Sequence, residues 1–157
     1  MLQNKFHAVQ VKDGWIKLGY SEKGLKECGF PSKSDKRFVA IKNPKYIVKL
    51  SKDITKYFSG QKVDFKCSFD LEDFSVFEKA VWKATKLIPY GKKISYGELS
   101  KRLGKPKAAR AVGNDLGKNP VPIVIPCHRV IKSDGSLGGF SGGLGWKKRL
   151  LDMEQSQ

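Results

Sequence analysis

The sequence predicts a mixed α/β fold in two parts, an N-terminal domain over residues 1–72 and a C-terminal domain over residues 73–157. β-branched and aromatic residues gather in short runs in the first part, which is typical of strands. In the second part, apolar residues recur at helical spacing behind helix-capping residues, which indicates a mainly helical domain. A chain of 157 residues is long enough for one domain or for two small ones that share an interface.

The N-terminal part is expected to form a small β-sheet with one short helix. Residues 14–19 indicate a short strand. Residues 37–42 and 45–50 indicate two stronger strands because they are rich in Ile, Val, Phe and Tyr. Asn43-Pro44 breaks the chain between these two strands. A short helix is expected over residues 54–58.

The C-terminal part is expected to begin with a well-capped helix. Ser75 and Glu78 have the spacing of a capping box, in which each side chain bonds the backbone N–H of the other residue. Apolar residues then recur at helical spacing as far as Ile88, and Pro89 ends the helix.

Two shorter helices follow and form a helix-turn-helix candidate. Ser95 and Glu98 begin the first of them, and Gly104 ends it. Pro106 fits the first turn of the next helix, which ends at Gly117. The exposed side of this helix is built from Ala and Gly, which permits close approach to a DNA duplex. Packing against another helix explains the same small residues equally well.

A constrained, apolar segment follows the helix pair. Residues 121–131 are apolar, but Pro122 and Pro126 are incompatible with a central strand. Residues 127–129, Cys-His-Arg, are therefore expected at a bend. Glycine-rich sequence follows, and a last helix is expected over residues 144–154.

The charge of the chain favours a polyanionic partner, and nucleic acid before a membrane surface. The formal net charge is +16, and the stretch from Lys92 to Lys132 carries ten basic residues against two acidic ones. A lysine-rich, solvated surface is the alternative explanation. No apolar run approaches the ~18 residues that cross a membrane, and no secretory signal is expected at the start. A cytoplasmic protein is therefore expected.

The cysteines indicate neither a zinc site nor a disulfide framework. Cys28, Cys67 and Cys127 form no pair with zinc-ligand spacing, and a site made with His7 is poorly supported. We expect reduced thiols and no metal.

One cysteine has the sequence context of a nucleophile. Cys127 is followed by His128, which can accept the thiol proton, and Arg129 and Lys132 can favour the thiolate. A Cys-His dipeptide alone is weak support, because most such pairs are structural.

A longer motif around this pair is specific. Residues 119–130, NPVPIVIPCHRV, resemble the active-site signature of the O6-alkylguanine-DNA alkyltransferases, also called methylated-DNA–protein-cysteine methyltransferases. The similarity extends from about Phe74 to Glu154 and includes residues 88–91, 95–96, 108–113 and 141–144. Residues 1–72 match only loosely.

This resemblance implies a fold and an activity. The N-terminal domain would be ribonuclease H-like, and the C-terminal domain winged-helix-like. The protein would repair double-stranded DNA by direct reversal, as a monomer and without a metal or organic cofactor. It would flip out O6-alkylguanine, with O4-alkylthymine as a second candidate lesion, and transfer the alkyl group irreversibly to Cys127.

The resemblance also assigns roles at the reacting centre. Cys127 would attack the alkyl carbon, His128 would take the thiol proton through a water, and Glu154 would hold His128. Asn119 would be a hinge residue behind the active-site segment. Tyr96 would contact guanine N3 and crowd the phosphate of the target nucleotide.

Further residues are assigned to DNA and to the base pocket. Arg110 would fill the gap left by the flipped base, as an arginine side chain can in a groove. The small residues around it and two nearby lysines would meet the duplex: Ala108, Ala109, Ala111, Gly113, Lys105 and Lys107. The pocket would be formed by Val130, Ser141, Lys147, Leu116 and Phe140, the last of which stands where many family members have Tyr.

Three other functions remain as alternatives. They are a helix-turn-helix transcription factor, a module that binds lesions without repairing them, and a thiol hydrolase. Methyl transfer from lesion-containing DNA to the protein would separate the proposed activity from all three.

Overall fold

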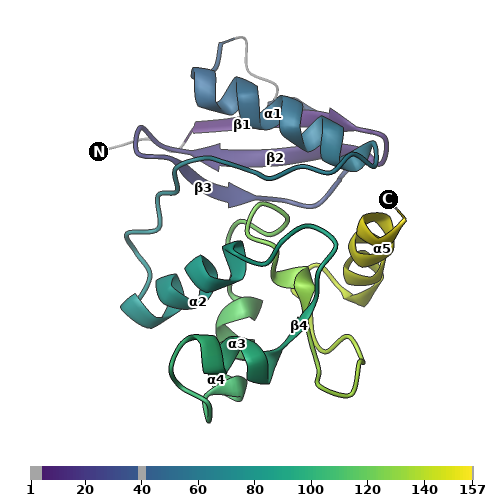
Figure 1. Ribbon diagram of the computed structural model, residues 1–157. Helices are drawn as coiled ribbons and strands as arrows, with labels where there is room; N and C mark the ends of the chain where they lie inside the picture. The colour runs from purple at the N-terminus through teal and green to yellow at the C-terminus, as the bar shows by residue number, and fades with distance from the viewer. Residues whose placement is uncertain (1–4, 39–41, 157) are drawn as a thin grey trace. The chain divides into compact units, whose positions relative to one another are not determined.

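The computed structural model describes residues 5–38 and 42–156, which divide into two compact units (Figure 1). One unit extends up to Glu72 and the other from Asp73 to Ser156. The first contains a small sheet and one long helix, and the second is mainly helical. The expected mixed α/β class is therefore confirmed. No helix in these described ranges is long and apolar enough to cross a membrane.

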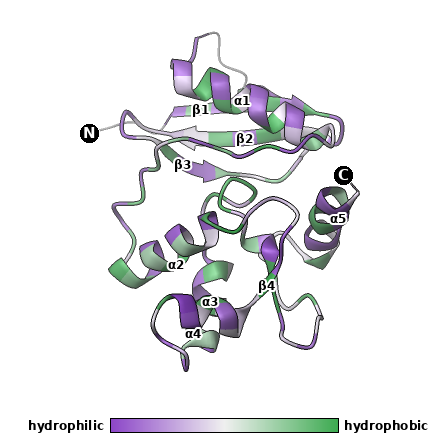
Figure 2. Ribbon diagram, in the orientation of Figure 1, coloured by the Kyte–Doolittle hydropathy of each residue, from purple (hydrophilic) through white to green (hydrophobic). Residues whose placement is uncertain are grey.

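The first unit is built on a three-stranded antiparallel sheet in the order β1-β2-β3. Its strands are β1 (Lys5–Val11), β2 (Gly14–Tyr20) and β3 (Leu25–Cys28). The helix α1 (Lys45–Phe58) packs on β1, and its buried residues recur at helical spacing. Figure 2 shows hydrophilic and hydrophobic residues alternating along α1, as this one-sided burial requires.

One predicted strand in this unit is wrong, and a second is wrong over the residues that the structure describes. The strand expected over residues 45–50 is the first half of α1, which begins directly after Pro44. Residues 37–38 of the strand expected over 37–42 lie in a 3₁₀ helix, η1 (Asp35–Phe38), while residues 39–41 lie outside the described part. The strand predicted over residues 14–19 is confirmed by β2. Residues 54–58 are helical as predicted, but they are the end of the longer helix α1 and not a short helix of their own.

Capping residues set the start of two helices in the second unit. α2 (Val76–Lys86) begins with a complete capping box, in which the Ser75 side chain accepts from Glu78 N and Glu78 Oε1 accepts from Ser75 N. α3 (Tyr96–Arg102) begins where the Ser95 hydroxyl accepts from Glu98 N at 3.0 Å. Both predicted starts are confirmed.

The expected helix pair is present, but its second helix starts late. α4 (Ala109–Gly117) packs against α3, and Pro106 lies in the preceding turn rather than in the first turn of the helix. The buried Ser100 side chain explains this turn, because it donates to Lys105 O and accepts from Ala108 N. These bonds hold the chain in a turn until Ala108, where α4 is capped.

The proline-rich segment forms the centre of the second unit. Residues 121–130 are all buried, and the expected bend is η2 (Cys127–Arg129), a single 3₁₀ turn. It leads into β5 (Val130–Ile131), which pairs in parallel with β4 (Ile94–Ser95). The last helix, α5 (Leu144–Gln155), matches the prediction and buries Leu150 and Leu151.

Candidate active site

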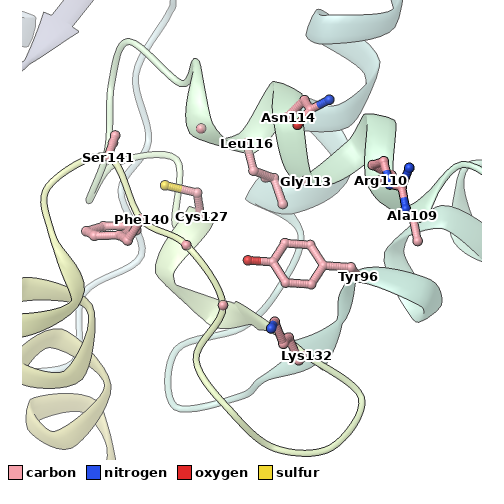
Figure 3. Close-up of a pocket in the computed structure, with 13 residues that line it drawn as sticks. Tyr96, Ala109, Arg110, Gly113, Asn114, Leu116, Cys127, Lys132, Phe140 and Ser141 are labelled. Carbon is pink, nitrogen blue, oxygen red and sulfur yellow. The ribbon is translucent and has the colours of Figure 1, made fainter.

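A cavity of about 680 Å³ opens beside Cys127 in the second unit (Figure 3). α3, α4, η2 and the glycine-rich loop before α5 contribute its walls. Its volume lies in the range of small-molecule pockets. The lining residues are Tyr96, Ala109, Arg110, Gly113, Asn114, Leu116, Gly117, Cys127, Lys132, Gly138, Gly139, Phe140 and Ser141.

The Cys127 thiol is almost fully buried and protonated at rest. Burial raises the pKa of Cys127 to about 11, although the Asn119 side chain and the positive charge of Lys147 oppose this rise. At neutral pH very little thiolate is therefore present. A nucleophilic role requires a base that takes the proton during the reaction.

His128 and Glu154 form a buried hydrogen-bonded pair directly after the cysteine. His128 Nε2 lies 2.8 Å from Glu154 Oε1, and neither side chain is exposed. Because an ionised carboxylate only accepts hydrogen bonds, Nε2 carries the proton and Nδ1 has the lone pair. The imidazole is thus held in one tautomer by a group on α5, 26 residues further along the chain.

Arg129 binds the same carboxylate from the other side. Its Nη2 donates to Glu154 Oε1 at 2.8 Å, its Nε to Oε2 at 3.0 Å, and its Nη1 to Ile88 O at 2.7 Å. The sequence-based expectation that Arg129 favours the Cys127 thiolate is therefore wrong. The cation that lowers the pKa of Cys127 is Lys147, whereas Arg129 is paired with Glu154.

The charges of this group follow from burial and pairing. Burial would raise the pKa of Glu154, but hydrogen bonds from His128 and Arg129 outweigh it and lower the pKa to about 2. Burial lowers the pKa of His128 below its usual value of 6.5, against the opposing effect of Glu154. At neutral pH the site therefore holds a carboxylate and a neutral imidazole, which can accept a proton.

Asn119 fixes the segment that carries the cysteine. Its Nδ2 donates to Ile125 O at 2.9 Å, and its Oδ1 accepts from Val121 N at 3.0 Å. Both bonds are buried, and they close the residues between Val121 and Ile125 into a tight loop. Ile123 in this loop has φ 77°, a conformation that is strained for a β-branched residue.

Lys147 is fully buried and ties the glycine-rich loop to the site. Its Nζ donates to the carbonyls of Val130 at 2.7 Å, Gly139 at 3.2 Å and Leu137. The Tyr96 hydroxyl, 3.3 Å from Nζ, is a fourth acceptor and shares the three N–H groups with these carbonyls. Burial lowers the pKa of Lys147 to about 8.

Tyr96 can act as a donor toward the cavity. Because its hydroxyl oxygen accepts from Lys147, its own proton is available to another acceptor, and Figure 3 shows the hydroxyl directed into the pocket. Gly138 makes this position possible, since a Cβ there would lie 2.6 Å from the Tyr96 hydroxyl.

Comparison with known proteins identifies the family. Residues 76–156 match the family model described as 6-O-methylguanine DNA methyltransferase, DNA binding domain. A methylated-DNA–protein-cysteine methyltransferase of Methanosarcina barkeri is 42% identical over 155 residues, covering 96% of this chain and 97% of the relative. The chain belongs to this family. The resemblance indicated by the sequence motifs is therefore confirmed.

Solved structures of this methyltransferase family have the same fold. Mycobacterium tuberculosis OGT in complex with DNA has a TM-score of 0.81 and 34% identity, covering 97% of this chain and 93% of that one. The O6-methylguanine-DNA methyltransferase from Pyrococcus kodakaraensis has a TM-score of 0.68 and 26% identity, and the match covers 97% of this chain and 99% of that one.

The structure brings only some of the expected methyltransferase residues into the cavity. Tyr96, Ala109, Arg110, Gly113, Leu116, Cys127, Phe140 and Ser141 line it. His128, Glu154, Asn119, Lys147 and Val130 are buried outside the cavity lining. Lys105, Lys107 and Ala111 are exposed, and Ala108 occupies the N-cap position of α4 without a side-chain cap bond.

Four lining residues have no role in the sequence-based site: Asn114, Gly117, Gly138 and Gly139. The glycine-rich composition after Ile131 indicates close packing, but which glycine meets Tyr96 depends on contacts between distant segments. For Asn114, its position one turn after Arg110 on α4 is the signal that could have indicated it.

Proposed function

We propose that this protein repairs DNA by transferring the alkyl group of O6-alkylguanine in duplex DNA to Cys127, once per molecule. The observation that carries the proposal is the position of Cys127. Its side chain lines a cavity large enough for a small ligand. The next residue, His128, forms a buried hydrogen bond with the carboxylate of Glu154.

The lesion must leave the base stack to reach this cavity. An alkyl group inside a duplex is inaccessible to a buried thiol, so the nucleotide is rotated out of the helix. Arg110 is exposed at the cavity rim, and its neighbours on α4 are small. It enters the stack and fills the space of the flipped base while α4 lies in the groove.

The chemical step is a displacement at the alkyl carbon. His128 Nδ1 takes the Cys127 proton through a bridging water, and Glu154 stabilises the resulting imidazolium. Cys127 Sγ forms a bond to the alkyl carbon as the bond from that carbon to O6 breaks. The bonding electrons pass to guanine, which accepts a proton, and Cys127 is left as a thioether.

The surrounding groups recognise the base and aid its departure. Tyr96 donates from its hydroxyl to guanine N3, and the backbone of Cys127, Val130 and Ser141 meets the polar edge of the base. Phe140 packs on the base and lacks the hydroxyl that a Tyr would place there. Asn119 holds the cysteine segment in register with α4.

The proposal also includes the domains of the chain, its oligomeric state and its location. Residues 1–72 form a ribonuclease H-like domain and residues 73–157 a winged-helix-like domain that carries the site. The protein acts as a monomer in the cytoplasm, on double-stranded DNA. Lys105 and Lys107 meet phosphates beside α4.

Intact-mass measurement after incubation with duplex DNA containing O6-methylguanine tests this function. The protein should gain the mass of one CH2 group per molecule, located on the peptide that contains Cys127. Cys127→Ser should abolish the gain and keep DNA binding, while Cys28→Ser and Cys67→Ser serve as matched controls that still react. Tight binding of the lesion without a mass change would instead indicate a lesion-binding module and overturn the proposal.

A further inference from the structure

A large share of the positive charge lies outside the family's DNA-binding domain. Residues 1–72 contain 15 basic and 8 acidic residues, a net charge of +7, whereas the family match covers residues 76–156. Charge on this scale attracts polyanions wherever it is concentrated on one face. The distribution of this positive charge over the first unit therefore decides whether the unit can bind a polyanion.

The lysines of α1 are concentrated in this way. Lys45, Lys49, Lys52 and Lys56 follow each other at intervals of four, three and four residues, so they share one side of the helix. All four are exposed. The opposite side is buried and apolar, with Ile47, Leu50, Ile54, Tyr57 and Phe58 against the rest of the unit.

Little negative charge neutralises this row. Asp53 is the acidic residue of α1, and it pairs with Lys49 at 3.0 Å. Lys45, Lys52 and Lys56 make no ion pair within residues 5–38 and 42–156. The row therefore presents at least three uncompensated positive charges to solvent.

We propose that this α1 lysine face binds the phosphate backbone of duplex DNA, as a contact additional to the helix pair α3–α4. The row from Lys45 to Lys56 is about 16 Å long at ~1.5 Å per residue. A duplex of that length carries about ten phosphates at one charge per ~1.7 Å. Each lysine of the face therefore has several phosphates of a duplex within reach.

The chemistry of the face favours DNA over a membrane. A helix that binds a bilayer surface inserts an exposed apolar side between the lipids. The apolar side of α1 is buried within its own unit, and Val48 is the one large apolar residue of the helix that is exposed, so the solvent-facing side of α1 is mainly lysine and has no apolar face to insert. The choice of DNA among polyanions rests on the proposed function. The existence of the lysine face rests only on the exposed lysines of α1.

The salt dependence of binding to undamaged duplex tests the proposal. The variant Lys45→Gln/Lys49→Gln/Lys52→Gln/Lys56→Gln should flatten the slope of log K against log salt by about 0.9 for each phosphate that the protein no longer neutralises. The corresponding Lys→Arg variant keeps the charge and should retain the slope. A charge-matched control replaces four lysines of the same unit that are exposed and lie off α1, namely Lys12, Lys33, Lys36 and Lys66, by Gln.

The outcomes separate this inference from the proposed function. Reaction with free O6-benzylguanine should be equal in the parent and all three variants, because that substrate needs the cavity alone. An unchanged slope in the α1 Gln variant, or an equal flattening in the control, would overturn the α1 contact. Reduced binding to anionic vesicles with an unchanged DNA slope would overturn it in favour of a different polyanion. A protein that fails to accept the alkyl group would refute the function and leave the slope measurement valid.

Discussion

At Cys127, a thiol with a raised pKa lies next to a histidine with a lowered one. Burial causes both shifts, because it disfavours the thiolate and the imidazolium alike. The resting site is therefore uncharged at Cys127 and His128, and in the proposed reaction charge separates only when the thiol proton moves to His128. Glu154 is the group placed to stabilise that separation, since it remains ionised down to a pH of about 2.

Replacing Glu154 tests this arrangement. Glu154 opposes the fall of the His128 pKa, so Glu154→Gln should lower that pKa further and make His128 a weaker base. The rate of transfer from free O6-benzylguanine should fall, and its decline at acid pH should move to lower pH. His128→Ala removes the base and should slow transfer by ~10²–10⁴-fold. An unaltered rate and pH profile in Glu154→Gln would contradict the assigned role.

Lys147 should influence the same thiol through its charge. Lys147→Gln keeps amide donors for the surrounding carbonyls but removes the charge that lowers the Cys127 pKa, so transfer at neutral pH should slow. Lys147→Met removes the donors as well and should be slower still. Since the pKa of Lys147 is about 8, the advantage of the parent over Lys147→Gln should shrink as pH rises through that value. A rate ratio that is constant across pH would show that the charge has no effect.

Local sequence indicates Cys127 and His128 better than it indicates the contacts of this site. These two residues are adjacent within one motif, whereas Glu154 lies 26 residues beyond His128 and is assigned only through the family resemblance. The pairing of Arg129 with Glu154 joins residues 25 apart, and the carbonyl contacts of Lys147 reach Val130 on another element. Such contacts depend on tertiary packing, so the sequence assigned Arg129 to the wrong partner.

Among the elements, those with capping signals are predicted well. Ser75 and Ser95 satisfy backbone N–H groups within three residues, so a local pattern is enough to locate α2 and α3. α1 has no side-chain cap, and the β-branched residues of its first half favour a strand over residues 45–50. Its helical period becomes evident only across all 14 residues. β1 depends on pairing with β2, which a local pattern does not encode.

Arg110 gives a prediction for α4. Only duplex DNA requires extrusion of the base, so Arg110→Ala should slow transfer from duplex much more than transfer from free O6-benzylguanine. Arg110→Lys is the matched variant, which keeps the charge but has a smaller head group, and it should recover part of the duplex rate. Single-turnover rates on both substrates provide the measurement. Equal losses on the two substrates would place Arg110 in the base pocket or in the stability of α4.

For the whole molecule, the net charge of +16 favours binding to DNA, and the number of phosphates that its basic residues neutralise sets how binding responds to salt. Contacts to phosphate are independent of sequence, so affinity for undamaged duplex should fall steeply with salt and vary little among sequences. Under the proposed function, lesion selectivity arises in the cavity after the nucleotide has been flipped. This separation allows the electrostatic part of binding to be altered without changing the chemistry.

The loop between α3 and α4 offers the corresponding test. Lys105 and Lys107 are exposed there, and replacing both by Ala should flatten the slope of log K against log salt by about 1.8, or ~0.9 for each phosphate. Lys107→Ala is the cleaner single change, because Lys105 Nζ also lies 5.9 Å from the centre of the Phe77 ring. Titrations of undamaged duplex at several salt concentrations measure the slope, and the rate with free O6-benzylguanine should stay at the parent value. A salt-independent affinity of the parent, or strong preference for one DNA sequence, would instead favour a transcription factor over a protein that scans DNA for damage.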